Sequence, residues 1–336
     1  MSVSFQVFRG SEDGSIVPDT TTRTLQPTEV YIETTHSGLC GTDEHYLKTG
    51  MALGHEGIGI VRQIGSSVTD VKVGARVGYG YIHRVCGICK QCLNGRDQFC
   101  EGGVRHYGSH DHDIGTFGEG VVWDASCVVP IPDGYDSADA APLMCAGVTV
   151  WTSLSEHVRS TDRVGIMGIG GLGHLAIKLA AAMGCQVVVL SSTEAKREEA
   201  LSFGASEYYV WKAGQEIPNF KQVDHLLLCG SANVDYPSLL QISILPLMAY
   251  NGTIFPLTVD HSNAPIPLLS LNNHGIRIQG VFVGSRASAR SLVEFAAEKK
   301  ITPTLMKFPL DKGGIEDAME VLRTGKMRYR GVLVRQ

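Results

Sequence analysis

The sequence predicts an α/β protein of two domains, one built on a doubly wound parallel sheet and one on an irregular, mostly antiparallel β structure. Its 336 residues are enough for two hydrophobic cores. Up to about residue 147, short β-like runs are broken by Gly, Pro and Asp; after residue 161, strand and helix patterns alternate. From about residue 285, further helical and strand segments follow.

The predicted elements follow the spacing of apolar residues. In the first part, strands are expected at Val30–Thr34, Gly57–Ile64 and Val121–Pro130. The alternating part begins with a buried strand at Val164–Met167, a glycine turn and a helix at Leu172–Met183. It continues with a strand at Gln186–Leu190, a helix at Lys196–Phe203, and strands near Tyr208 and at His225–Leu228.

Composition is that of an ordinary globular protein. Apolar residues make up 43% and charged residues 19%, which argues against disorder. The net charge is −5 without a basic run, so neither nucleic acid nor a membrane is expected as a partner. Arg9, Glu12 and Asp13 stand where a signal peptide needs an apolar stretch. We therefore expect a cytoplasmic protein in a reducing compartment, acting on a small molecule.

Four cysteines lie within fifteen residues, in the pattern Cys86-x2-Cys89-x2-Cys92-x7-Cys100. Four thiolates so close together indicate a closed tetrahedral zinc site, which would stabilise its loop and leave no position for substrate. An iron–sulfur cluster is the alternative, because ferredoxins share the first two spacings, C-x2-C-x2-C. Their next cysteine follows after three residues and precedes proline, whereas here Cys100 precedes Glu101. Zinc is favoured.

A second set of metal-type residues is spread more widely. Cys40, His55 and Cys145 together would leave one coordination position open, which is the arrangement of a catalytic zinc site. Each residue alone is weak evidence, since a single buried cysteine usually packs as a small hydrophobic residue. That interpretation is given to the three cysteines without a companion motif, Cys127, Cys185 and Cys229.

The segment Gly168-Ile169-Gly170-Gly171-Leu172-Gly173 matches the G-x-G-x-x-G pattern. The pattern alone is weak, but here it follows a predicted strand and opens a predicted helix. Gly168 permits the tight turn, Gly170 lets backbone N–H groups approach a pyrophosphate, and Gly173 lets the helix pack against the strand. The helix dipole favours the same negative charge. The segment indicates a Rossmann-type dinucleotide site.

The chain resembles the zinc-containing medium-chain alcohol dehydrogenases, and most closely their cinnamyl-alcohol-dehydrogenase-like branch. The resemblance covers essentially the whole length. Besides the four-cysteine loop and the glycine motif, it rests on C-G-T-D-E-H at 40–45, G-H-E-G at 54–57, P-L-M-C-A-G at 142–147 and G-V-F-V-G-S at 280–285. It implies a GroES-like catalytic domain at 1–147 and 285–336, a Rossmann domain at 148–284, and two zinc ions per chain.

The resemblance also implies an activity and residue roles. Hydride would pass between NADP(H) and an alcohol or aldehyde that is aromatic, allylic or medium aliphatic. Thr42 would take the alcohol proton and pass it through the cofactor ribose to His45, Asp43 would fix the tautomer of His55, and Glu56 would act beside the metal. The cofactor would contact Gly168, Gly170, Gly171, Leu172, Gly173, Ser191, Ser192, Lys196, Val283 and Arg330.

Cofactor choice is predicted from the end of the second Rossmann strand. An acidic residue there would bind the ribose 2′-hydroxyl of NAD and repel a 2′-phosphate. The strand instead ends in Ser191-Ser192-Thr193, followed by Lys196 and Arg197, which can bind a phosphate. Glu194 is the one residue in this segment that would disfavour a phosphate. The alternative role for the serine and threonine hydroxyls is to cap the following helix. The sequence favours NADP(H).

Assembly and alternative functions complete the predictions. The run Ile276–Val283 is expected to form one strand that pairs with its twin in a homodimer, with a tetramer as the alternative. Only fourteen residues separate Cys40 from His55, and this short loop helps to wall the substrate pocket. Alternatives for function are an NAD enzyme acting on a polyol or secondary alcohol, a metal-free reductase or crystallin-like relative, and a zinc-stabilised binding protein without catalysis.

Overall fold

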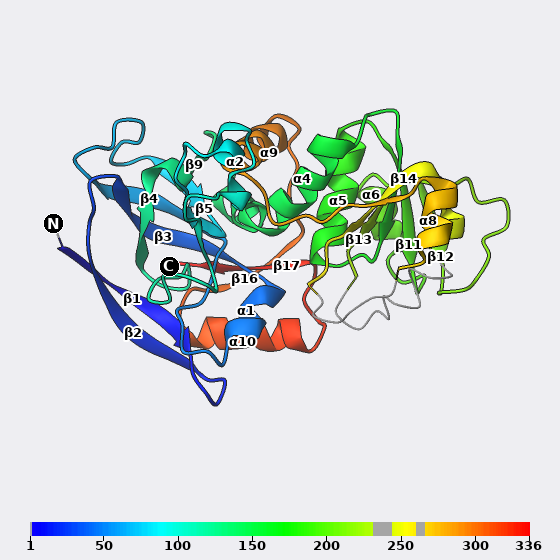
Figure 1. The fold of residues 1–336 in the computed structure, drawn as a ribbon. Helices are drawn as coiled ribbons and strands as arrows, with labels where there is room; N and C mark the ends of the chain where they lie inside the picture. Colours follow the sequence, from blue (N-terminus) through cyan, green and yellow to red (C-terminus); the bar gives the residue numbers. More distant parts are fainter. Residues whose placement is uncertain (1, 231–243, 260–265) are drawn as a thin grey trace. The chain divides into compact units, whose positions relative to one another are not determined.

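The computed structural model describes residues 2–230, 244–259 and 266–336 (Figure 1). The chain divides into two compact units. The first combines Met1–Val148 with Val283–Gln336, and the second is Thr149–Phe282. The first unit is therefore built from both ends of the chain.

The first unit is a mostly antiparallel β structure. Its largest sheet has the order β16-β17-β3-β4-β5-β9, with β8 also paired to β3. The strands are β3 (Glu29–Leu39), β4 (Gly57–Ile64), β5 (Arg76–Tyr79), β8 (Gly120–Asp124), β9 (Val129–Pro130), β16 (Leu305–Pro309) and β17 (Arg330–Val334). Two smaller sheets pair β1 (Ser2–Gly10) with β2 (Ile16–Thr24), and β6 (Ile82–Arg84) with β7 (Arg105–His106).

Strand β17 brings the end of the chain into the middle of this sheet. It runs parallel to β16 and antiparallel to β3, and Gly331 pairs with Leu39. Arg330 therefore lies beside the end of β3, where the chain continues into Cys40. This register is what allows a residue near the C-terminus to reach the metal-type residues of the first motif.

Short helices connect the strands of the first unit. They are α1 (Gly41–Tyr46), α2 (Lys90–Leu93), η1 (Asp97–Phe99), η2 (Ala125–Cys127), α3 (Ser137–Ala140), η3 (Ala141–Met144), α9 (Arg286–Glu298) and α10 (Lys312–Arg323). Asp311 caps α10 by accepting a hydrogen bond from the N–H of Gly314 at 2.8 Å. The helix then buries Ile315 and Met319 in a core shared with Leu39, Leu53 and Leu333.

The second unit is a parallel sheet with helices, as expected for a Rossmann-type domain. In the described residues, the strand order is β12-β11-β10-β13-β14-β15. These are β10 (Arg163–Met167), β11 (Gln186–Ser191), β12 (Glu207–Val210), β13 (Val223–Leu228), β14 (Met248–Pro256) and β15 (Arg277–Ile278). The helical segments are α5 (Gly171–Ala182), α6 (Arg197–Ser202), η5 (Leu245–Leu247) and α8 (Leu268–His274), and α4 (Ala146–His157) precedes β10.

Two predicted strands differ from the structure. The run 121–130 is split by η2 into β8 and β9, because Asp124 accepts the N–H of Ser126 and turns the chain. The expectation of one strand over 276–283 is wrong, since only Arg277 and Ile278 pair with β14. Gly280 follows, and Val283 takes a φ of +48°, outside the β region. No helix of the described residues has the length and apolar character needed to cross a membrane.

Candidate metal centres and cofactor turn

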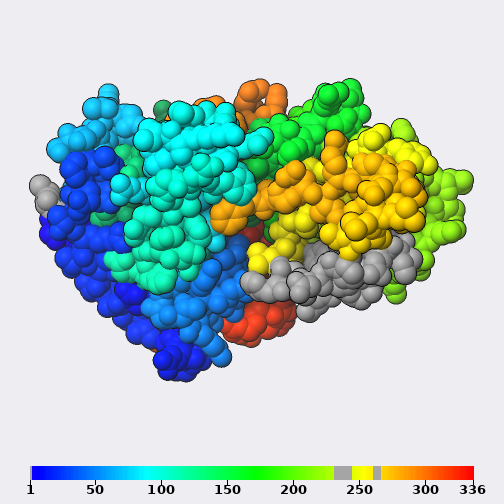
Figure 2. Space-filling model, viewed as in Figure 1, coloured from blue at the N-terminus to red at the C-terminus, as the bar shows by residue number. Residues whose placement is uncertain are grey.

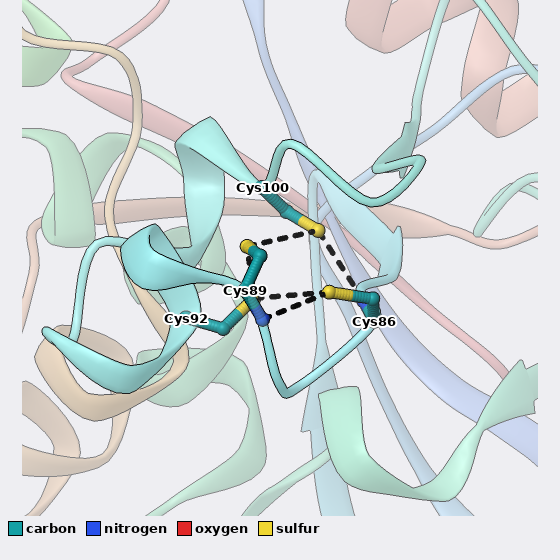
Figure 3. A group of neighbouring side chains, drawn as sticks. All are labelled: Cys86, Cys89, Cys92 and Cys100. Atoms are coloured by element: carbon teal, nitrogen blue, oxygen red, sulfur yellow. Dashed lines mark hydrogen bonds between the residues drawn. The ribbon is translucent and has the colours of Figure 1, made fainter.

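The four clustered cysteines converge on one point. Figure 3 shows their sulfur atoms turned toward one another, and all four lie within 4.8 Å of each other. The Sγ atoms of Cys89 and Cys92 are 3.5 Å apart, and those of Cys89 and Cys100 are 3.9 Å apart. Hydrogen bonding by the backbone N–H of Cys92 lowers the pKa of Cys89 to about 6. A thiolate is the form that binds a metal, so this donor set fits zinc.

The loop that carries these cysteines lies at the surface of the first unit. Figure 2 shows the chain near residue 100, in cyan, on the outside of the molecule. Large apolar side chains of the loop are exposed, Ile88 by 80% and Leu93 by 74%. With so little apolar packing, the loop depends on its four thiols for a defined shape. None of the nine cysteines, all of which lie in the described residues, forms a disulfide.

The second set of metal-type residues also converges. Cys40, His55, Glu56 and Cys145 each place one donor atom within 4.8 Å of the others. They come from the N-terminus of α1, the segment before β4, and the end of η3. The Nε2 atom of His55 is buried and has no hydrogen-bond partner among the described residues. A buried imidazole nitrogen facing two thiols is the environment of a metal ligand, so zinc fits this set too.

A buried carboxylate orients His55. Asp43 Oδ1 lies 2.9 Å from His55 Nδ1, and Asp43 Oδ2 accepts the backbone N–H of Cys40 at 3.0 Å. Because a carboxylate only accepts, Nδ1 carries the proton and Nε2 is left for a metal. Burial opposes protonation of His55, but the Asp43 carboxylate raises its pKa well above the usual value.

Glu56 is completely buried beside these residues and is paired with Arg330. One guanidinium nitrogen of Arg330 donates to both carboxylate oxygens at 2.5 Å. Gly38 makes room for the carboxylate, since a Cβ there would lie 2.0 Å from Glu56 Oε2. Burial raises the pKa of Glu56 to about 7, against the opposing effect of Arg330. Arg330, predicted to contact the cofactor, is thus bound to Glu56 in the first unit.

The two residues predicted to relay the proton lie on α1. Thr42 is half-buried, and its hydroxyl is 3.6 Å from Cys40 Sγ. His45, one turn further along the helix, is exposed. Hydrogen bonding with the Cys145 thiol, aided by His55, lowers the pKa of Cys40 despite its burial. The hydroxyl of Thr42 therefore lies next to a cysteine, Cys40, whose lowered pKa favours the thiolate form.

The glycine motif forms the turn between β10 and α5. Gly168 has a φ of +91°, which favours glycine. A Cβ at Gly173 would lie 1.9 Å from the carbonyl oxygen of Gly168, whereas a Cβ at Gly170 would meet nothing within 4 Å. The space over Gly170, at the N-terminus of α5 with Gly171 and Leu172, fits a pyrophosphate. His174, given no role from the sequence, is buried and contacts the Gly171 carbonyl at 2.8 Å through Nδ1.

The hydroxyl-rich turn after β11 lies beside the glycine turn. Lys196 Nζ donates to the carbonyl of Ile169 at 2.7 Å, which places its ammonium group next to the motif. The N-cap of α6 is Lys196, with no side-chain cap, so Ser191 and Ser192 do not cap this helix. Arg197 is less available than expected, because it pairs with Glu194 and donates to the Tyr208 carbonyl.

Some residues around the metal-type set were not predicted from the sequence. Tyr107 packs on His55, and its hydroxyl donates to Asp43 at 3.0 Å. No motif links Tyr107 to the others, because it belongs to the segment after β7.

Val283, predicted to contact the cofactor, belongs to the first unit, where its positive φ marks the turn before α9.

Comparison with known proteins places this geometry in a family. Residues 26–133 match the alcohol dehydrogenase GroES-like domain, and residues 171–298 match the zinc-binding dehydrogenase domain. A probable formaldehyde dehydrogenase of Bacillus subtilis is 35% identical, over 93% of this chain and 91% of its own. Probable cinnamyl alcohol dehydrogenase 2 of Picea abies is 34% identical, over 95% and 92%.

A solved structure supports the same assignment. The cinnamyl alcohol dehydrogenase of Helicobacter pylori, crystallised with NADP(H), superposes with a TM-score of 0.86 at 26% identity, over 99% of each chain. The matched domains account for the predicted GroES-like and Rossmann-type architecture in the same order along the chain. The chain therefore belongs to the zinc-containing medium-chain alcohol dehydrogenases, in their cinnamyl-alcohol-dehydrogenase-like branch.

Proposed function

We propose that this alcohol dehydrogenase is an NADP(H)-dependent zinc enzyme that interconverts an alcohol and its aldehyde, with Cys40, His55 and Cys145 as ligands of a catalytic zinc ion. The proposal depends above all on the partnerless, buried Nε2 of His55 facing two thiols. When bound, zinc supplies a Lewis acid for the substrate oxygen, and the cofactor supplies or accepts the hydride. Because these are only three ligands, the fourth coordination position of a tetrahedral zinc ion would be open for substrate.

The surrounding side chains each have a defined task in this proposal. Asp43 holds His55 in the tautomer that leaves Nε2 for the metal. Thr42 receives the proton of the alcohol hydroxyl, and His45 releases a proton at the exposed side of α1. The carboxylate of Glu56 lies beside the proposed metal ligands, and its ion pair with Arg330 compensates its buried charge.

The four-cysteine loop is proposed to hold a second, structural zinc ion, which gives two zinc ions per chain. Its sulfurs form a closed set without an open position. The nine cysteines form no disulfide, which agrees with the proposed cytoplasmic location. Metal analysis of the purified protein tests the count: two zinc ions per chain are expected, whereas one or none would refute the proposed pair of sites.

NADP(H) is proposed as the cofactor because of the turn after β11. Ser191 and Ser192 are not used to cap α6, and the ammonium group of Lys196 lies against the glycine turn. Hydroxyl and ammonium donors suit a 2′-phosphate. A relative of known structure was crystallised with NADP(H). Steady-state kinetics of the wild-type protein test this directly: an equal or higher kcat/KM with NADH would overturn it.

The substrate is proposed to be an aromatic or allylic alcohol or aldehyde, or a medium aliphatic one. Tyr81 meets the ring of His55 edge to face, with ring centres 5.6 Å apart, and stacks on His106 at the same distance. The aromatic ring of Tyr81 next to the proposed metal ligand His55 favours a substrate with a flat or apolar body. A panel of cinnamyl, benzyl and straight-chain aldehydes, assayed with NADPH, tests this. Equal kcat/KM for formaldehyde and cinnamaldehyde would contradict it.

We propose a homodimer formed through the second unit. In the described residues, β15 is the last strand of the parallel sheet, and its outer edge is available for pairing. On neighbouring α8, Leu268 and Leu269 are 69% and 73% exposed and offer apolar surface that a second copy of the chain would cover. Light scattering at micromolar concentration tests this: twice the chain mass is expected, and a single-chain mass would refute it.

A further inference from the structure

Tyr107 occupies a position beside the proposed catalytic zinc site that no sequence motif marks. It follows β7, and only 1% of its surface is exposed. Its ring stacks on the imidazole of His55, with ring centres 4.5 Å apart and an angle of 29° between the planes. One face of the proposed ligand His55 is therefore covered by an aromatic ring, which keeps water from that face.

The hydroxyl group of Tyr107 has a fixed direction of hydrogen bonding. The backbone N–H of Gly54 points to the hydroxyl oxygen at 3.3 Å, and a backbone N–H can only donate. The oxygen of Tyr107 therefore accepts from Gly54, and its O–H remains to donate to Asp43 Oδ1, 3.0 Å away. Both capacities of the hydroxyl are used within the site.

The acceptor of this bond is the same atom that orients His55. Asp43 Oδ1 receives Nδ1–H of His55 at 2.9 Å and is completely buried. Its other oxygen accepts the N–H of Cys40 at 3.0 Å. Asp43 Oδ1 also accepts the backbone N–H of Gly54 at 3.2 Å. Asp43 is thus held by two backbone N–H groups and by the side chains of His55 and Tyr107.

The ring of Tyr107 is itself immobilised. Tyr46 meets it edge to face, with ring centres 5.3 Å apart and an interplanar angle of 83°. Tyr81 meets it at 6.1 Å and 68°. A ring packed on three sides cannot rotate freely, so the hydroxyl is held in one position next to Asp43.

We propose that Tyr107 is a positioning residue for the catalytic zinc site: through Asp43 and by direct stacking, it fixes the orientation of His55 and so strengthens zinc binding at Cys40, His55 and Cys145. The inference rests on the proposed function. Groups that hold a ligand in place without touching the metal typically change metal affinity or activity by about 10–100-fold when removed. An effect in that range is expected here.

The test replaces Tyr107 by Phe, which keeps the stacked ring and removes only the hydroxyl. Tyr79→Phe is the matched control, because Tyr79 is also fully buried in the first unit and its hydroxyl bonds Thr34 at 2.6 Å. Zinc affinity is measured by competition with a chromophoric chelator, together with the visible spectrum after cobalt substitution and the thermal midpoint. The zinc ion of the four-cysteine loop serves as an internal check on folding.

Tyr107→Phe is expected to bind the catalytic zinc ion about 10–100-fold more weakly, with an altered cobalt spectrum, while the four-cysteine zinc is retained. Tyr79→Phe is expected to lose thermal stability only. In an Asp43→Asn background, Tyr107→Phe should have a smaller effect, because its hydrogen bond acts through Asp43. Wild-type affinity and spectrum in Tyr107→Phe would overturn the inference. A wild-type protein that holds zinc only at the four-cysteine loop would refute the proposed function itself.

Discussion

Arg330 and Glu56 form a buried ion pair that joins the last strand of the chain to the proposed catalytic site. The side chains are 6% and 0% exposed, and one guanidinium nitrogen contacts both carboxylate oxygens at 2.5 Å. The residues are far apart in the sequence but meet at the end of β3, because β17, which begins with Arg330, and β4, which follows Glu56, pair with β3 on its two sides. Each charge is tolerated only because the other is present.

Breaking this pair from one side is expected to be costly. Arg330→Met leaves the Glu56 carboxylate buried and unpaired, and should lower the free energy of unfolding by about 3–5 kcal/mol. The control is Arg335→Met, because Arg335 is 34% exposed and lies 3.5 Å from Glu33; it should cost about 0–1 kcal/mol. Urea unfolding of both variants measures the difference, and equal losses would contradict the prediction.

The two cysteine sets should respond differently to single substitutions. Cys145→Ser is expected to remove one zinc ion and abolish turnover while thermal stability changes little. Cys89→Ser should remove the other zinc ion and lower the thermal midpoint, because the exposed loop loses the ion that shapes it. Cys229→Ala, outside both sets, should keep two zinc ions. Metal analysis and calorimetry decide, and a Cys145→Ser protein with two zinc ions and full rate would show that the catalytic site is misplaced.

The glycine turn predicts a separation of stability from cofactor binding. Gly170→Ala adds a Cβ that meets no atom, so the fold should be unaffected while NADPH binding weakens. Gly173→Ala places a Cβ 1.9 Å from the Gly168 carbonyl oxygen and should lower stability by about 1–3 kcal/mol. Thermal midpoints and NADPH fluorescence titrations check both variants. Unchanged NADPH affinity in Gly170→Ala would argue against a pyrophosphate in that space.

Ser191→Asp should reduce the preference for NADPH. A carboxylate at the end of β11 would repel the 2′-phosphate. We expect kcat/KM with NADPH to fall, by an amount that corresponds to about 1–3 kcal/mol of activation free energy. Ser202→Asp adds the same charge at the exposed end of α6 and should leave the ratio of NADPH to NADH activity unchanged. Equal ratios in the two variants would remove Ser191 from the cofactor site.

Acid stability of the second unit should depend on Glu207. Hydrogen bonds from Arg163 lower the pKa of Glu207 to about 2, from an ordinary value of 4.5. A lowered folded-state pKa stabilises the protein above pH 4.5, and this contribution is lost as pH falls toward 2. The thermal midpoint of wild type should therefore exceed that of Glu207→Gln at pH 7, and the gap should narrow below pH 4.5 and close near pH 2. Glu316→Gln, at an exposed pair 3.8 Å long, is the control and should show no comparable gap.

Structural features formed by a single contiguous segment could be predicted from the sequence. The four-cysteine loop and the glycine turn each lie within a short segment, and the strand Gly57–Ile64 has the predicted bounds. The run 276–283 was misleading, because its apolar residues suggested a strand where Gly280 and the positive φ of Val283 end the pairing.

Features assembled from distant segments could not be predicted in the same way. Tyr107 reaches Asp43 across 64 positions, and Arg330 reaches Glu56 across 274. Neither contact leaves a periodic or spaced signal, since each arises only when the folded chain brings distant segments together. The family resemblance pointed to Arg330 and Glu56 separately, but their pairing is seen only in the structure.

The central place of β17 also sets an order of events during synthesis. All of Thr149–Phe282 leaves the ribosome before Arg330–Val334 is made, so the second unit has its complete sequence while the first still lacks an inner strand. Domains commonly fold as their chain becomes complete. The first unit must therefore wait until Arg330–Val334 emerge, because until then the end of β3 at 36–39 lacks its partner β17 and Glu56 lacks its counter-charge. A chain that stops before Arg330 should therefore form the parallel sheet of the second unit but not the complete metal centre.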